Sequence, residues 1–61
     1  EWALMFANMQ PSNAAAILSE MNQGTALRIL RELETGTRAA ILSSMEAQTA
    51  SRFSQQLVGD S

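Results

Sequence analysis

Residues 9–20 read MQPSNAAAILSE, residues 21–32 read MNQGTALRILRE, and residues 33–44 read LETGTRAAILSS. Each segment opens with Met or Leu and carries Ile-Leu at its ninth and tenth positions. The spacing continues into residues 45–56, MEAQTASRFSQQ, which open with Met and carry Phe53 at the ninth position. The chain is therefore built from a twelve-residue repeat, and such a repeat bears directly on the fold class.

Within each repeat the apolar residues have helical spacing. Ala14, Ile17, Leu18 and Met21 lie at i, i+3, i+4 and i+7, which is one face of a helix. Applied to five repeats, the template covers 20 positions, of which 18 are apolar. Its four columns are Trp2, Ala14, Ala26, Arg38 and Ala50; Met5, Ile17, Ile29, Ile41 and Phe53; Phe6, Leu18, Leu30, Leu42 and Ser54; and Met9, Met21, Leu33, Met45 and Leu57. Arg38 and Ser54 are the two departures.

One continuous helix does not fit this period. Twelve residues at about 100° each rotate the apolar stripe by about a third of a turn per repeat, so the stripe would face no single surface. A coiled coil requires a period of seven or eleven. Pro11, Gly24 and Gly36 follow soon after the residue that closes each stripe, where a helix can restart. The pattern predicts helices at residues 2–9, 11–21, 23–33, 35–45 and 47–58, joined by one or two residues.

The predicted fold is all-α, with about five short helices in a compact superhelix. Helices of about ten residues are marginal alone in water, so each must pack its stripe on a neighbour. Asn22 is a candidate N-cap, Glu34 or Thr35 starts the fourth helix, and Glu34 and Glu46 lie at helix N-termini. We expect one domain over residues 1–58 and a frayed tail at 59–61.

The composition argues against chemistry carried by side chains. The chain has no His, Cys or Tyr, and Lys is also missing, so the usual general bases, thiolates and ligands of transition metals are not available. Four Arg and six acidic residues give a net charge of −2, which disfavours nucleic acids and anionic membranes. The sequence therefore predicts a protein that is not an enzyme and that needs no cofactor.

The repeat resembles the N-terminal cytosolic domain of MgtE-type magnesium transporters. The resemblance covers residues 3–57 and is carried by Met9-Gln-Pro-Ser-Asn-Ala-Ala-Ala-Ile-Leu18 and its equivalents, Met21 to Leu30 and Leu33 to Leu42. The same module forms the C-terminal domain of small flagellar proteins of the MotE and YlxF type, in which it follows a membrane anchor and a coiled coil. MotE acts as a chaperone for a motor protein.

The resemblance implies two alternative functions. The transporter domain senses Mg²⁺ through carboxylates at a domain interface, and here the acidic residues Glu20, Glu32, Glu34, Glu46 and Asp60 are scattered. This scatter favours a flagellar chaperone domain outside the cytoplasm that binds a motor or stator-associated protein, in a parent anchored to the membrane. The alternative is a Mg²⁺-sensing regulatory domain in the cytoplasm, with Glu34 and Glu46 as weak candidates to flank the ion.

The candidate partner-binding residues are Trp2, Met5, Phe6 and Arg38. Trp2 and Phe6 belong to the first repeat, which no earlier repeat covers, so this end must be capped, self-associate or bind a partner. Simple packing on the second helix is the alternative for both rings. Arg38 breaks its apolar column and is a partner contact, an ion-pair partner of Glu34 or a surface side chain. The Met column is interpreted as core.

Overall fold

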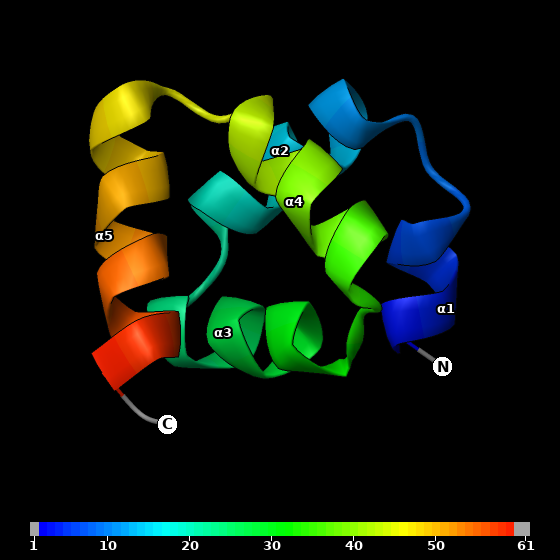
Figure 1. The fold of residues 1–61 in the computed structure, drawn as a ribbon. Coiled ribbons are helices and arrows are strands. Elements are labelled where there is room, and N and C mark those ends of the chain that lie inside the picture. Colours follow the sequence, from blue (N-terminus) through cyan, green and yellow to red (C-terminus); the bar gives the residue numbers. More distant parts are fainter. Residues whose placement is uncertain (1, 60–61) are drawn as a thin grey trace.

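A computed structural model describes residues 2–59, and five α-helices with no strand make up this part of the chain (Figure 1). The helices are α1 (Trp2–Ala7), α2 (Pro11–Glu20), α3 (Gln23–Glu32), α4 (Thr35–Ser43) and α5 (Ala47–Gly59). The all-α prediction is confirmed, and every predicted helix boundary lies within two residues of the observed one. Gly59, assigned to the frayed tail, is the last residue of α5, and the rest of that tail lies outside the described residues.

Side-chain caps start two of the helices. The Asn22 side-chain oxygen accepts a hydrogen bond from the backbone N–H of Thr25 at 3.2 Å, which confirms Asn22 as the N-cap of α3. Glu34 caps α4, because its Oε1 accepts from the Thr37 backbone N–H at 3.0 Å and from the Thr37 hydroxyl at 3.2 Å. These bonds satisfy N–H groups that have no partner inside the helix.

Gly24 and Gly36 follow the two caps and lie inside the helices, so they do not end a helix. Gly24 and Gly36 are the second residues of α3 and α4, and neither has a positive φ. A Cβ atom would lie 3.2 Å from the Asn22 side-chain oxygen at Gly24, and 3.0 Å from Glu34 Oε1 at Gly36. Glycine at these positions leaves room for the capping oxygen.

The connections are longer than predicted at two places. Residues 21–22 and 33–34 are two-residue connections as expected, whereas residues 8–10 and 44–46 are three-residue connections. In both longer cases a polar side chain binds the end of the preceding helix. Asn8 donates to the Leu4 carbonyl at 3.1 Å, and the Ser44 hydroxyl donates to the Ala40 carbonyl at 3.1 Å. Such side-chain bonds compete with continuation of the helix.

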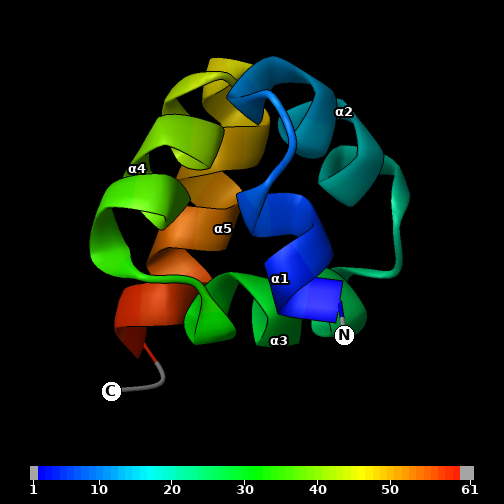
Figure 2. The same cartoon turned by 90° about the vertical axis from the view of Figure 1, so that its right-hand side faces the viewer.

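The helices pack on their second neighbours along the chain. α1 packs on α3, α2 on α4, and α3 on α5, while α2 also contacts α3 and α4 contacts α5. Figures 1 and 2 show α1 and α5 on opposite sides of the globule, with α3 along the bottom in both views. Each helix therefore buries its apolar stripe against the helix two positions away.

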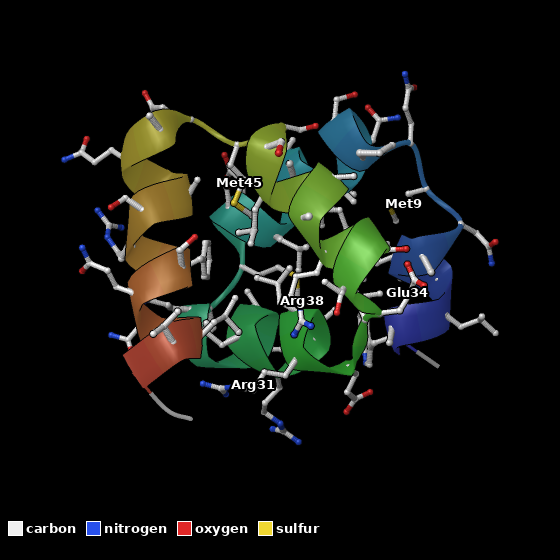
Figure 3. All side chains as sticks on the ribbon, viewed as in Figure 1. Met9, Arg31, Glu34, Arg38 and Met45 are labelled. Carbon is white, nitrogen blue, oxygen red and sulfur yellow. The ribbon has the colours of Figure 1, made fainter. Side chains whose placement is uncertain are left out.

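Ten of the thirteen buried hydrophobic residues belong to the repeat columns, and the other three are Ala3, Ala15 and Leu27. Phe6, Leu18, Leu30 and Ile41 are its largest fully buried side chains. Met45 is buried at its edge (Figure 3), and Met9 and Met21 are partly buried against it, which confirms the interpretation of the Met column as core. No polar side chain is buried among residues 2–59. The core is apolar throughout, so its stability comes from packing and removal of surface from water.

Candidate functional site

Two apolar columns of the repeat have opposite patterns of burial along the chain. We term one of them the backward column, and its members are Met5, Ile17, Ile29, Ile41 and Phe53. The side chains of Met5 and Ile17 are 46% and 43% exposed. The other three are at most 5% exposed. Only α3, α4 and α5 have a helix two positions earlier to pack on. The backward column therefore faces the preceding helix of each stacked pair.

The column Phe6, Leu18, Leu30, Leu42 and Ser54 behaves in the reverse way, and we term it the forward column. Its first three members are fully buried, whereas Leu42 and Ser54 are only partly buried. α1, α2 and α3 have a helix two positions later, and α4 and α5 have none within the described residues. The forward column therefore faces the following helix.

These patterns leave one open apolar face at each end of the stack. The leading face consists of Met5 on α1 and Ile17 on α2, and no earlier helix within residues 2–59 covers them. The terminal groove lies between α4 and α5 and has a volume of about 310 Å³. It is lined by Thr35, Arg38, Ala39, Leu42, Ser54, Leu57 and Val58.

The two polar departures from the repeat both line the terminal groove. Arg38 and Ser54 stand where the template requires an apolar residue, and both are partly exposed beside Leu42. The Arg38 guanidinium donates to the Thr35 hydroxyl at a long 3.5 Å. Both departures therefore lie on a face that no later helix within residues 2–59 covers.

The interpretation of Arg38 as the ion-pair partner of Glu34 is wrong. Glu34 Oε1 accepts two hydrogen bonds from Thr37, and no ion pair joins Glu34 to Arg38, both of which lie in the described part of the chain. Figure 3 shows the two side chains apart, on different sides of the start of α4. Arg38 belongs to the terminal groove.

The other predicted partner-binding residues do not form one surface with Arg38. Trp2 is 59% exposed, and its ring stacks on Phe6 with the centroids 6.3 Å apart and the planes at 21°. Phe6 itself is 1% exposed, so its assignment to an exposed docking surface is wrong. Trp2 and Met5 lie on α1, on the opposite side of the globule from α5 (Figure 2).

A second hollow lies between α1 and α3 and has a volume of about 300 Å³. Trp2 lines it together with Thr25, Arg28, Ile29 and Glu32. Ile29 is a buried member of the backward column, and its position beside Trp2 agrees with the direction that we assign to this column. This hollow belongs to a contact that the chain already makes internally.

Several residues of the open faces were not among the sequence predictions. Ile17, Leu42 and Leu57 belong to the apolar columns, and only their place in the stack distinguishes them from core residues. Val58 also lines the terminal groove, at a repeat position that is otherwise polar. The signal that finds them is the rule that each helix packs on its second neighbour. That rule is a property of the topology.

The weak metal candidates lie at opposite ends of α4. Glu34 precedes this helix and Glu46 follows it, and nine helical residues at about 1.5 Å each span about 14 Å. Glu34 Oε1 accepts two hydrogen bonds from Thr37 at the start of the helix. Residues 2–59 contain no cluster of three or more acidic side chains that could hold a metal, and Asp60 lies outside this range.

No helix in the described part of the chain combines the length and the hydropathy of a membrane span. The family described as the MgtE intracellular N domain matches residues 1–58. No curated protein and no solved structure matches the chain significantly. The family match covers nearly the whole chain and names the transporter rather than the flagellar proteins. The chain therefore belongs to the MgtE intracellular N domain family.

Proposed function

We propose that this chain is a non-catalytic regulatory domain of an MgtE-type magnesium transporter, and that it acts by docking against another part of that protein. The observation that carries the proposal is the match to the MgtE intracellular N domain over residues 1–58. The match favours the transporter over the flagellar chaperone that the scattered acidic residues suggested. A flagellar partner stays a prediction of the resemblance alone.

The distribution of charge supports docking as the mode of action. Glu20, Glu32, Glu34 and Glu46 are all exposed, and no three of them cluster. Mg²⁺ in proteins commonly keeps several waters and is held by only one or two carboxylates. A single exposed glutamate of this chain, facing a carboxylate of a second domain, is sufficient for such a site. Mg²⁺ would then stabilise the docked arrangement by reducing repulsion between like charges.

Magnesium uptake by the transporter that carries this chain tests the proposal. We expect deletion of residues 2–59 to leave uptake active and to weaken its response to the internal Mg²⁺ concentration, because a regulatory domain contributes control rather than the transport path. Single Glu→Gln substitutions at Glu20, Glu32, Glu34 and Glu46 identify the carboxylate that faces the ion. An unchanged response after the deletion, or a parent protein that carries no Mg²⁺, would contradict the regulatory role.

A further inference from the structure

A third hollow lies between α1 and the connection that joins α3 to α4, and it has a volume of about 240 Å³. We term it the acidic hollow, because the two charged residues that line it are Glu32 and Glu34. Its remaining walls are Ala3, Leu4, Ala7 and Leu33. We propose that the acidic hollow binds an arginine side chain that a partner protein presents between apolar residues. This inference does not rest on the proposed regulatory role, because it uses only the charge and the apolar walls of the hollow.

The exposure of Leu4 comes from its place in the repeat. Leu4 is 63% exposed. The corresponding residues of the other four helices are exposed as well, namely Ala16, Arg28, Ala40 and Arg52. Arg28 is exposed even though α1 and α5 both pack on its helix, α3. This side of each helix lies outside the stack, so the exposure of Leu4 does not depend on an end of the stack.

The combination of a leucine with two carboxylates belongs to this hollow rather than to the repeat. One repeat later, Ala16 stands in the place of Leu4 and Ser44 in the place of Glu32. Glu46, in the place of Glu34, is the one carboxylate among the equivalent residues there. An exposed large apolar side chain beside charged groups is typical of a surface that binds another molecule.

The connection holds both carboxylates at the hollow. Leu33 between them has extended backbone, with φ −78° and ψ 148°, and its side chain is buried. Glu34 is fixed by the two hydrogen bonds that its Oε1 accepts from Thr37, and Figure 3 shows it beside α1. Neither Glu32 nor Glu34 forms an ion pair within residues 2–59. Arg28, one turn before Glu32, lines the hollow on the other side. The acidic hollow itself therefore contains no positive charge to balance its carboxylates.

Arginine matches both kinds of wall. Its aliphatic stem can pack on Leu4 and Ala7 while the charged group stays at the rim. The planar guanidinium has five N–H donors and can bond two carboxylates at once, whereas the ammonium of lysine is one compact charge. Hydrated Mg²⁺ gains nothing from apolar walls. Charge complementarity and the apolar walls together favour arginine with apolar neighbours.

Titration of the folded chain with acetyl-Leu-Arg-Leu amide tests the proposal, with backbone amide chemical shifts as the readout. EDTA in the buffer separates this binding from any site that needs Mg²⁺. We expect saturable shifts at residues 32–34 and at Ala7, with a Kd of about 1 mM for so small a probe. The peptide with citrulline in place of arginine has nearly the same shape and no charge, so it should bind about tenfold more weakly. Equal binding of both peptides, or no saturable shift at these residues up to about 10 mM, overturns the proposal.

The repeat supplies matched controls for the two carboxylates. Glu20 corresponds to Glu32 and Glu46 to Glu34, and neither control residue lines the acidic hollow. Glu32→Gln and Glu34→Gln should each weaken binding about two- to fivefold, as expected for exposed ion pairs. Glutamine keeps an oxygen for the Thr37 N–H, so α4 keeps its cap. Glu20→Gln and Glu46→Gln should have little effect. Equal weakening by test and control variants would mean attraction to net charge alone and would overturn the proposal.

Leu4→Ala tests the apolar wall. Val58→Ala is its control, because Val58 is 75% exposed and lines the terminal groove instead. Leu4→Ala should weaken the arginine peptide about threefold, since the stem loses apolar contact, and Val58→Ala should leave the affinity unchanged. Circular dichroism checks that both variants keep their helices. An affinity that Leu4→Ala does not change overturns the assignment of the arginine stem to this wall.

Discussion

At the scale of single residues, the starts of α3 and α4 show how two positions depend on each other. Asn22 and Glu34 place a side-chain oxygen over the first turn, where it accepts the N–H of the residue three positions later. The glycine two positions after each cap leaves space for that oxygen. The effect of the cap therefore depends on the glycine, because a side chain at the glycine position would crowd the capping oxygen.

Substitution of the cap and the glycine measures this coupling. Asn22→Ala should lower the free energy of unfolding by about 1 kcal/mol, because a helix N–H loses its partner. Gly24→Ala should be nearly neutral in the wild type, since the gain of about 0.4–1 kcal/mol from the lower entropy of the unfolded chain is offset by contact with the Asn22 oxygen. In the Asn22→Ala background the same substitution should stabilise. Urea unfolding gives all four values, and equal effects of Gly24→Ala in both backgrounds would contradict the coupling.

Two leucines of the same size and different burial test where stability resides. Leu30 is fully buried and Leu4 is 63% exposed. Leu30→Ala should cost about 2–5 kcal/mol, because a cavity remains in the packed core. Leu4→Ala should change stability by about 0.5 kcal/mol or less. Thermal unfolding followed by circular dichroism compares the two variants. Similar losses of stability would contradict the assignment of Leu30 to the core and Leu4 to the surface.

At the scale of the element, the helices are short and depend on their neighbours. α1 has six residues, α2 and α3 have ten, and α4 has nine. The sequence predicted where they begin and end, because Pro11, the caps and the apolar spacing act within one helical turn. It underestimated two connections, because the side-chain bonds of Asn8 and Ser44 to the preceding helix have no simple sequence signature.

A peptide of residues 22–33 separates local preference from packing. It contains α3 with its Asn22 cap and Arg31 in the last turn, both of which favour a helix. The peptide has twelve residues, at the lower end of the range of about 12–15 residues below which isolated helices are marginal, so we expect little helical circular dichroism in water. The intact chain is the control. Helicity in the peptide equal to that of α3 in the whole protein would contradict the dependence on packing.

At the scale of the whole molecule, the stack of second neighbours decides which residues are available to partners. Phe6 and Ile17 look alike in the repeat, yet Phe6 is buried and Ile17 is half exposed. The difference arises because α3 covers Phe6, whereas residues 2–59 contain no helix two positions before α2 that could cover Ile17. Exposure in this fold is a matter of position in the stack.

The same arrangement predicts how the isolated chain responds to magnesium. Residues 2–59 contain no acidic cluster, and α4 separates Glu34 from Glu46. A ligand raises the unfolding midpoint only when it binds the folded state, so millimolar Mg²⁺ should leave the midpoint unchanged. Thermal unfolding with and without MgCl₂ measures this, with NaCl at equal ionic strength as the control. A rise that disappears in Glu34→Gln or Glu46→Gln would show that the chain binds the ion alone.

The sequence by itself determined the twelve-residue period, the all-α class, the residues at which the helices begin, the Asn22 cap and the resemblance to the family. All of these depend on residues a few positions apart, or on a pattern that recurs along the chain. Only the tertiary structure decided that each helix packs on its second neighbour, that Arg38 lines a groove rather than pairing with Glu34, and that Met5 and Ile17 stay open. These features depend on the direction that the chain takes at each connection, and that direction results from the packing of all the helices together.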